Sequence, residues 1–336
     1  MKILIIGGTG TISSAVVNDL VNQRHDVYVL NRGNHNDELP SGVTPIICDI
    51  NDMSAAKAAL SGYNFDAVAD FIAFRPDAVQ RDVELFSGRC KQYVFISSAS
   101  CYQKPPKSHI ITENTPLCNP YWQYSRDKID CENYLFEQYE QNGFPVTVVR
   151  PSHTYGNRSV PTALHGNKGS WQVVRRIMEG KPVIIPGDGE SLWTITHNTD
   201  FAPLFCALLG KEQAIGQAYH ITSGEALTWN RIYDLIGDAV GVPVKKAHLT
   251  SRDIISAGEK YGYDFEGGLL GDKTYSTVFD NSKVRKFLPD YKMKTPFNKG
   301  VKQTIDYILA HEEYQQADEE FDEFCDKLWK NHGDIF

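Results

Sequence analysis

The sequence predicts an α/β fold in which a doubly wound parallel sheet carries a smaller C-terminal lobe. Two observations lead to this prediction. Apolar segments of strand length alternate with amphipathic segments over the first 150 residues, which is the pattern of parallel strands joined by helices on both faces of a sheet. Residues 3–6 (ILII) and 93–96 (YVFI) are continuously apolar, as strands buried on both faces should be.

The expected elements follow in order along the chain. Strands are expected near residues 2–7, 26–31, 43–48, 66–72, 91–97 and 145–150, with helices near 11–23, 52–60, 76–87 and 121–142. After Arg150 the alternation fades, and segments rich in Gly, Pro and aromatic residues separate helix-like runs near 171–179, 199–209, 228–240 and 297–311. We therefore divide the chain into a sheet domain, residues 1–156, and a smaller lobe, residues 157–336, from which some segments return to the sheet. Because doubly wound folds bind ligands at the carboxyl edge of the sheet, this lobe is expected to cover that edge and bind substrate.

The composition argues against several classes of protein. A net charge of -8 disfavours broad nucleic-acid binding, which needs a basic surface. No apolar run approaches the roughly 18 residues of a membrane helix, so no membrane association is expected. The seven cysteines are odd in number and form no Cys-x-x-Cys pair, and the histidines show no ligand spacing. We expect a cytoplasmic protein with reduced thiols and no metal ion.

A glycine-rich turn, residues 7–13 (GGTGTIS), joins the first strand to the first helix. Glycine permits the tight turn and the close approach of backbone to a pyrophosphate, and the helix N-terminus supplies N–H donors. The alternative is a plain strand-to-helix turn, but the position after the first strand predicts a Rossmann-type domain that binds NAD or NADP. The turn residues expected to contact the cofactor are Gly7, Thr9, Gly10, Thr11 and Ile12.

The end of the second strand carries Asn31 and Arg32, where NAD sites usually have a carboxylate. An asparagine can still hydrogen-bond a ribose hydroxyl, and an arginine can pair with the 2′-phosphate of NADP. Arg32 could also be solvated or stack on the adenine, so the choice between NAD and NADP stays open. Asp49, at the end of the third strand, could accept a hydrogen bond from the adenine amino group or cap a turn.

Tyr124 and Lys128 place a phenol and an ammonium on one face of a helix, because residues i and i+4 are neighbours there. A nearby ammonium should lower the phenol pKa from its usual value of about 10. The pair could then move a proton at a substrate oxygen while hydride moves at carbon. Ser98, at the end of the strand near 91–97, could hydrogen-bond the same oxygen or cap the following turn.

Together these segments resemble the extended short-chain dehydrogenase/reductases, specifically the NAD-dependent epimerase/dehydratase family. The resemblance also includes residues 150–156 (RPSHTYG), 186–189 (PGDG), 197–202 (HNTDFA) and 280–283 (DNSK). It implies that Tyr124 is the acid/base, that Lys128 orients the nicotinamide ribose, and that Ser98 holds the substrate oxygen. Beyond the residues already named, the cofactor contacts are expected from Ile50, Phe71, Ile72, Ala73, Ser97, Pro151 and His153.

Two departures from the family pattern bear on the substrate. Family dehydratases carry an acidic pair just after the serine position, but Ala99 and Ser100 stand here, so a dehydratase is disfavoured. Trp193 stands where nucleotide-sugar epimerases carry an arginine that clamps the diphosphate. Tryptophan cannot replace that clamp, although it can stack on a sugar. The expected substrate contacts are Ser100, Tyr102, His153, Trp193 and His197. The alternative for Tyr102, Trp193 and His197 is a packing role in the core, and the alternative for His153 is a hydrogen bond to a local backbone carbonyl.

The predicted function is NAD(P)-dependent chemistry at a secondary carbinol or carbonyl of a sugar or sugar-like substrate, with an epimerase preferred and a keto-sugar reductase or dehydrogenase as the alternative. Residues 194–200 also resemble chloroplast stem-loop-binding proteins, which keeps an RNA-binding or cofactor-sensing regulatory protein as an alternative of another class. The complete Tyr/Lys/Ser set and the acidic net charge count against it. By resemblance to extended family members, the helices near 76–87 and 121–142 are expected to form a homodimer.

Overall fold

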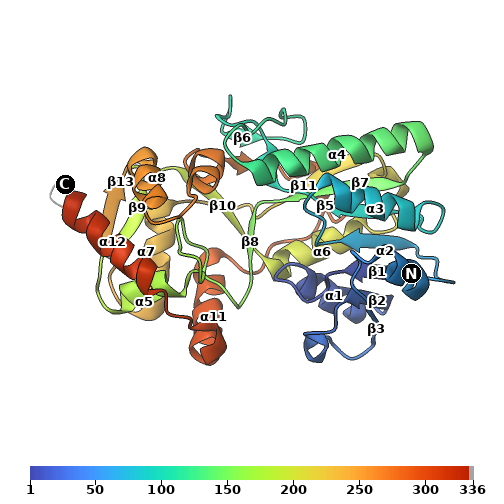
Figure 1. Cartoon of the computed structure of the whole chain (residues 1–336), viewed down its shortest axis with the longest axis horizontal. Helices are drawn as coiled ribbons and strands as arrows, with labels where there is room; N and C mark the ends of the chain where they lie inside the picture. Colours follow the sequence, from blue (N-terminus) through green and yellow to red (C-terminus); the bar gives the residue numbers. More distant parts are fainter. Residues whose placement is uncertain (333–336) are drawn as a thin grey trace.

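The computed structural model, which describes residues 1–332, contains two lobes (Figure 1). The lobe on the right of Figure 1 is built on a seven-stranded sheet with the order β11-β7-β5-β4-β1-β2-β3, in which every neighbouring pair is parallel. Its strands are β1 (Lys2–Ile6), β2 (Asp26–Asn31), β3 (Val43–Ile47), β4 (Ala67–Asp70), β5 (Tyr93–Ile96), β7 (Val146–Pro151) and β11 (Gln217–Ile221). The predicted doubly wound α/β fold is confirmed.

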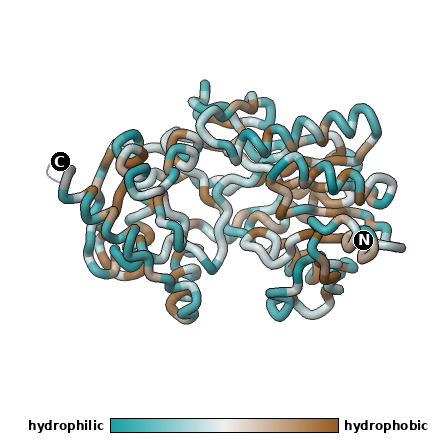
Figure 2. The backbone as a smooth tube through the Cα atoms, viewed as in Figure 1, coloured by the Kyte–Doolittle hydropathy of each residue, from teal (hydrophilic) through white to brown (hydrophobic). Residues whose placement is uncertain are grey.

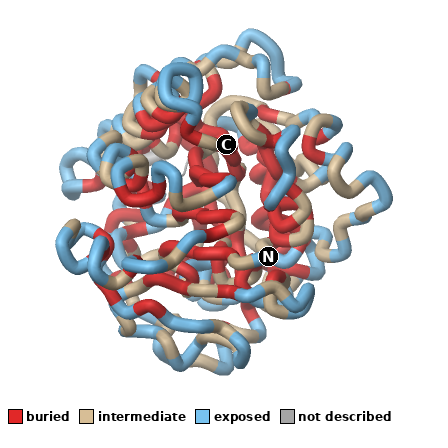
Figure 3. Tube along the Cα trace, turned by 90° about the vertical axis from the view of Figure 1, so that its right-hand side faces the viewer, coloured by how far each residue is buried: buried red, intermediate tan, exposed pale blue. Residues whose placement is uncertain are grey.

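Helices cover both faces of this sheet. One face is covered by α1 (Ser13–Asn22) and α6 (Asn198–Leu208), and the other by α2 (Met53–Ala59), α3 (Pro76–Phe86) and α4 (Gln123–Asn142). Successive side chains of a strand point to opposite faces. Ile3 and Ile5 accordingly belong to the core under α1 and α6, whereas Leu4 and Ile6 belong to the core on the other side. Figure 2 shows these apolar strands in brown inside the lobe, and Figure 3 shows buried segments along its interior.

Most expected elements of the sheet lie within a few residues of their observed bounds, and one difference has a local cause. The strand expected to run to residue 72 ends at Asp70. The Asp70 carboxylate accepts hydrogen bonds from the backbone N–H groups of Ile72 (2.5 Å) and Ala73 (2.7 Å), which turns the chain out of the sheet. This turn places residues 71–74 at the carboxyl edge of the sheet.

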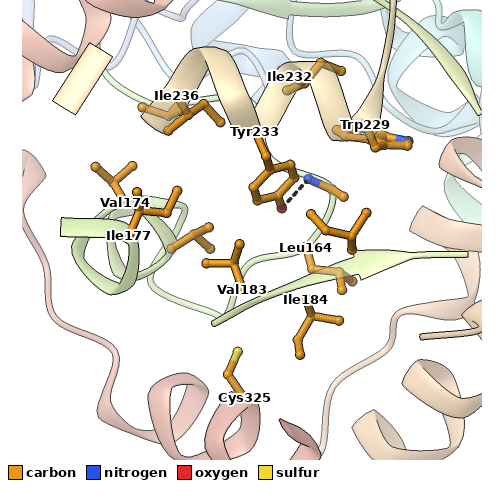
Figure 4. Close-up of a cluster of buried hydrophobic side chains, with 14 of the residues drawn as sticks. Leu164, Val174, Ile177, Val183, Ile184, Trp229, Ile232, Tyr233, Ile236 and Cys325 are labelled. Carbon is orange, nitrogen blue, oxygen red and sulfur yellow. Dashed lines mark hydrogen bonds between the residues drawn. The ribbon is translucent and has the colours of Figure 1, made fainter. Parts of the chain in front are cut away.

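The lobe on the left of Figure 1 has its own core, part of which is shown in Figure 4. Tyr233 lies in this core with Val174, Ile177, Val183 and Ile184, and its buried hydroxyl accepts a hydrogen bond from the backbone N–H of Ala163 (3.2 Å). The elements of this lobe are α5 (Trp171–Met178), β9 (Val183–Pro186), α7 (Trp229–Val240), β13 (Lys246–Leu249), α8 (Ser251–Glu259), α9 (Glu266–Gly268), a π-helical turn (Leu269–Lys273), α11 (Phe297–Leu309) and α12 (Glu319–His332).

Short strands join the two lobes. Strand β8 (His153–Tyr155) follows β7 after one residue and pairs in parallel with β10 (Leu192–His197), which pairs with β12 (Ala226–Thr228). The remaining short elements are β6 (Ile110–Ile111), β14 (Val278–Phe279), α10 (Ser282–Arg285) and the single helical turns Asn36–Glu38, Ala99–Cys101, Glu212–Ala214 and Glu312–Tyr314. Because α6 and β11 return to the sheet, the chain passes between the lobes repeatedly, and the division at residue 156 stays a prediction.

No helix within residues 1–332 has both the length and the apolar composition needed to cross a bilayer. All seven cysteines, each of them in the described part of the chain, are free thiols.

Candidate active site

The glycine-rich turn closes tightly over the edge of the sheet. Gly7 has a φ of +78°, and a Cβ at this position would lie 2.4 Å from Cγ2 of Ile72. The Ser13 hydroxyl donates a hydrogen bond to the carbonyl of Gly7 (2.6 Å) and accepts one from the N–H of Gly10 (3.0 Å), so this serine fastens the turn. No side chain caps the N-terminus of α1. The turn and the first helical N–H groups therefore form a cradle that only glycine permits and that suits a pyrophosphate.

A groove of about 810 Å³ runs from this cradle along the carboxyl edge of the sheet to Tyr124. Fifteen of the predicted cofactor contacts line it, among them Tyr124, Lys128 and Pro151 at one end and Arg32 and Asp49 at the other. The other ten are Gly7, Thr9, Gly10, Thr11, Ile12, Asn31, Ile50, Phe71, Ile72 and Ser97. Ala73 and His153 do not line it. The lining residues that the sequence prediction missed are Ser13, Leu30, Gly33, Asn34, His35, Cys48, Asn51, Phe74, Ile96, Thr154 and Arg158.

Polar groups at the far end of the groove are arranged for a ribose. The Asn31 Oδ1 atom accepts a hydrogen bond from the N–H of Gly33 (2.8 Å), while its buried Nδ2 donor has no hydrogen-bond partner within residues 1–332. The Asp49 carboxylate stabilises a turn by accepting hydrogen bonds from the backbone N–H (3.0 Å) and the side-chain amide (3.1 Å) of Asn51. The orphaned amide of Asn31 is the kind of group that a ribose hydroxyl would satisfy. The groove therefore fits a dinucleotide.

Two residues that follow the first six strands of the sheet hold the glycine-rich turn from outside. Arg158 donates a hydrogen bond to the carbonyl of Thr9 (3.3 Å) and forms an ion pair with Glu38. Asn198, at the start of α6, donates to the carbonyl of Thr11 (2.7 Å). The turn is thus held by residues that lie far along the sequence.

The side chain of Lys128 is buried, and two backbone carbonyl groups fix its position. Its ammonium donates hydrogen bonds to the carbonyls of Ala73 (2.6 Å) and Ile96 (2.7 Å), and Ala73 takes part in the site through this contact. The Nζ atom lies 4.6 Å from the ring centroid of Phe74 and 5.8 Å from that of Tyr124. Burial lowers the pKa of Lys128 to about 8.

The phenol of Tyr124 is enclosed by the protein. Burial raises the pKa of Tyr124 to about 12, and the hydrogen bond with Ser98 opposes this only in part. The Lys128 ammonium is directed at two carbonyls rather than at the phenol. At neutral pH the Tyr124 hydroxyl therefore keeps its proton and is a proton donor. A lowering of the pKa of Tyr124 by the cationic nicotinamide ring of oxidised cofactor stays a prediction.

Ser98 belongs to a chain of hydroxyl groups. Its Oγ atom lies 2.9 Å from that of Ser100, which accepts a hydrogen bond from the Ser125 hydroxyl (2.7 Å). Asn119 donates to the Ser125 hydroxyl (3.3 Å) and to the backbone carbonyl of Ser100 (2.8 Å). Ser98 also accepts from the N–H of Ser100 (3.2 Å), so it caps its turn as well. These contacts fix the Ser98 hydroxyl beside Tyr124.

A second cavity, of about 230 Å³, meets the groove at Tyr124 and Pro151, the two residues that line both. Besides these two it is lined by Ser98, Ala99, Ser100, Lys104, Trp122, Ser152, His153, Trp193, Thr194, Asp272, Thr277 and Phe279. Three of the predicted substrate contacts, Ser100, His153 and Trp193, are among them. We call this space the substrate cavity.

Tyr102 and His197 are not brought to the substrate cavity. The Tyr102 hydroxyl lies between Arg150 (3.2 Å) and the Nδ1 atom of His220 (3.0 Å) in the interior. His197 caps α6 through Nδ1, packs edge-on against Tyr155, and lines a separate cavity beside α1. Both occupy the packing roles that the sequence analysis kept as alternatives.

Comparison with known proteins gives the family of this chain. The profile described as NAD dependent epimerase/dehydratase family matches residues 3–222. The chain belongs to this family. The sequence predictions of the family and of an NAD(P)-dependent enzyme are thereby confirmed.

Individual relatives of this family member are distant. The 2'-dehydrokanamycin reductase of Streptomyces kanamyceticus is 25% identical over 87% of this chain and 80% of that protein. The chloroplast stem-loop binding protein of 41 kDa b of Arabidopsis thaliana is 26% identical over 79% of this chain and 70% of that protein. The solved structure of epimerase Mth375 of Methanothermobacter thermautotrophicus superposes with a TM-score of 0.75 at 18% identity, covering 93% of each chain, which shows the shared fold.

In this family member the substrate cavity has one neutral base and two charged groups. Burial lowers the pKa of His153 to about 3, so its imidazole is uncharged. Lys104 and Asp272 also line the cavity, and sequence reasoning missed both because they stand alone in irregular segments with no motif around them. Within residues 1–332 no three acidic, cysteine or histidine side chains gather in a way that could hold a metal ion.

Proposed function

We propose that this family member reduces a carbonyl group of a sugar-like substrate to a secondary alcohol, using NADH or NADPH. The observation that supports this best is the position of Tyr124, a protonated phenol on the boundary between the cofactor groove and the substrate cavity. The reduced nicotinamide supplies a hydride to the carbonyl carbon. The Tyr124 hydroxyl gives its proton to the carbonyl oxygen, which Ser98 holds, so the C=O group becomes CH–OH.

The lining of the cavity supports a nucleotide-free sugar as the substrate. Trp122, Trp193 and Phe279 offer aromatic surfaces that can stack on the apolar face of a sugar ring, between hydroxyl, imidazole and charged groups. The cavity of about 230 Å³ is smaller than the roughly 300–1,000 Å³ of pockets that hold larger ligands. No arginine is among the described residues that line it, so a diphosphate has no bidentate clamp here. The similarity to 2'-dehydrokanamycin reductase agrees with such a substrate.

Epimerisation, which the sequence analysis prefers, is the second candidate, and the family profile favours it. It would begin with oxidation of a carbinol, in which Tyr124 takes the hydroxyl proton and bound oxidised cofactor would take the hydride from carbon, and it would end with return of that hydride to the other face of the ketone. That cycle needs a phenolate and enough room for the ketone to turn over. The small cavity favours the reductase.

Turnover assays with the purified protein test the proposal. D-Glucose, D-galactose and myo-inositol are offered with NAD⁺ or NADP⁺ at alkaline pH, and formation of reduced cofactor is followed by absorbance. We expect net reduction of cofactor with at least one nucleotide-free compound. Conversion of UDP-glucose to UDP-galactose without net change of cofactor would establish the epimerase instead. No reaction with any of these compounds would contradict the proposed substrate class.

We expect Arg32 to let the enzyme accept NADP(H) as well as NAD(H). Arg32 is exposed in the groove at the end of β2, and residues 31–35 contain no carboxylate that would repel a 2′-phosphate. Arg32→Glu should raise the Kd of NADPH by a factor of about 10 or more and change that of NADH by less than about threefold. Cofactor fluorescence titrations measure both constants. Lys57→Glu, an equal charge change on an exposed residue away from the groove, is the control, and equal losses for NADPH and NADH would refute the assignment.

We also propose a homodimer formed by the outer faces of α3 and α4, which is the arrangement expected from the family resemblance. Size-exclusion chromatography with light scattering gives the mass, and a monomer would contradict the proposal. The seven free thiols suit a reducing compartment and support a cytoplasmic location.

A further inference from the structure

Two charged groups that line the substrate cavity, one buried and one half-buried, have no hydrogen-bond or ion-pair partner among residues 1–332. Lys104 is only 4% exposed, yet within residues 1–332 no group accepts a hydrogen bond from its ammonium and no carboxylate lies within ion-pair distance. Asp272 lines the same cavity, and no described residue donates a hydrogen bond to its carboxylate. Holding an unpaired charge in a largely enclosed cavity is costly, so both groups gain from a ligand whose polar atoms reach them in the bound state.

The segment that carries Asp272 packs against Trp122, which stands two residues before Tyr124 in the sequence. It is one turn of π-helix, Leu269–Lys273, a conformation that is rare and frequently found at functional sites. A Cβ on Gly267 would lie 2.2 Å from the ring of Trp122, and one on Gly271 would lie 3.0 Å from its Cβ, so these two glycines allow the close approach.

One buried side chain fixes this segment to the catalytic serines. The side-chain amide of Asn119, 2% exposed, donates to the carbonyl of Gly271 (2.7 Å) and to that of Ser100 (2.8 Å). Asp272 is therefore held at a defined position relative to Ser98 and Tyr124. A residue with no role in the cavity would not require hydrogen bonds that fix the position of its segment.

We propose that Asp272 and Lys104 are substrate-binding residues that grip hydroxyl groups of a nucleotide-free sugar or cyclitol, while its carbonyl carbon lies against Tyr124. This inference rests on the proposed function and specifies its substrate class. The carboxylate accepts a hydrogen bond from one hydroxyl, and the ammonium donates one to another. A neutral polyol satisfies both groups, because each hydroxyl is both donor and acceptor. A purely apolar ketone would leave both charged groups without a partner.

Binding of a substrate hydroxyl by Asp272 should depend on pH, because the carboxyl group of Asp272 titrates. Burial raises the pKa of Asp272 to about 6, and the ammonium groups of Lys104 and Lys273 oppose the rise. The other titratable groups of the cavity, Tyr124 and His153, are uncharged near neutral pH. Because only the carboxylate accepts strongly, binding should be fully developed above pH 6 and weaken as the pH falls through that value.

Binding to the NADPH-bound enzyme tests the proposal without turnover. The probes are D-glucose, D-galactose and myo-inositol, which as alcohols cannot be reduced, and Kd is measured by saturation-transfer NMR. Asp272→Asn and Lys104→Gln should each raise the Kd of the best-bound probe by roughly 10- to 100-fold. Asp272→Asn should also abolish the weakening of binding at low pH. Glu266→Gln makes the same charge change as Asp272→Asn on an exposed residue of the preceding helix α9; it is the matched control and should leave Kd unchanged.

The outcomes separate this inference from the function on which it rests. Probe binding that Asp272→Asn and Lys104→Gln leave unchanged, in variants with wild-type thermal unfolding, would overturn the assignment of the two residues alone. No binding of any probe to the wild-type enzyme, together with no turnover of these compounds, would instead overturn the sugar-like substrate class. Unchanged NADPH affinity in both variants shows that the cofactor groove is intact.

Discussion

Tyr124→Phe should lower kcat by a factor of about 10²–10⁴, which is the usual contribution of a positioned general acid or base. The phenyl ring preserves the packing against Trp122 and Phe74, whose ring centroids lie 5.0 Å and 6.3 Å away, and removes only the hydroxyl that donates the proton. The Kd of NADPH should therefore change by less than about threefold. Single-turnover kinetics and cofactor titration measure the two quantities separately.

The pH dependence of the two reaction directions supplies a further check on Tyr124. With the pKa of the phenol raised to about 12, the proton donor is present throughout the neutral range, so reduction should not decline through loss of this proton until the pH approaches that value. Alcohol oxidation needs the phenolate and should become faster as the pH rises. Tyr139→Phe removes the same hydroxyl group from an exposed position on α4 and should leave kcat unchanged. A Tyr124→Phe enzyme with wild-type kcat would refute the proposed mechanism.

Arg150→Met is expected to cause the largest loss of stability, about 3–5 kcal/mol of the free energy of unfolding. Arg150, at the end of β7, forms a buried ion pair with Glu132 of α4, with Nε to Oε1 at 2.9 Å and Nη2 to Oε2 at 2.5 Å. Removing the guanidinium leaves a buried carboxylate whose remaining described hydrogen bond comes from Ser97. Urea unfolding followed by circular dichroism measures the loss.

A double variant tests the cause of this loss. Arg150→Met with Glu132→Leu removes both charges, and replacing a whole buried ion pair by apolar side chains is often close to neutral. The double variant should therefore recover most of the stability that Arg150→Met loses. If the single variant unfolds like the wild type, or if the double variant loses the sum of two independent penalties, the buried charge is not what destabilises the protein.

The sequence predicts the sheet better than it predicts the substrate cavity, for a physical reason. Strands such as β1 and β5 are buried on both faces, so their apolar runs are visible without tertiary information. Strand β11 was missed because it contains His220, a buried polar residue that is satisfied by Tyr102 and by the carbonyl of Asp280 (2.7 Å). A buried polar residue whose hydrogen-bond partners lie far away in the sequence interrupts the apolar run by which a buried strand is recognised.

The same distinction holds in the site. Residues of the glycine-rich turn and the Tyr124/Lys128 pair are recognisable because local geometry fixes their spacing. Lys104 and Asp272 belong to segments far apart in the chain, and the packing of Gly267 and Gly271 on Trp122 places the segment of Asp272 beside the cavity that Lys104 also lines. The direction of the Lys128 ammonium likewise depends on carbonyls of Ala73 and Ile96, which lie far from it in the sequence.

The return of α6 and β11 to the sheet has a consequence for how this polypeptide acquires its shape during synthesis. While residues 1–156 emerge from the ribosome, one side of their sheet lacks Phe201 and Phe205, which later fill it, and one sheet edge lacks its neighbour β11. Such an incomplete folding intermediate exposes apolar surface and an unpaired strand edge, and both favour aggregation. We therefore expect residues 1–156 to complete their fold only after α6 and β11 have been synthesised, and to be unstable when produced without them.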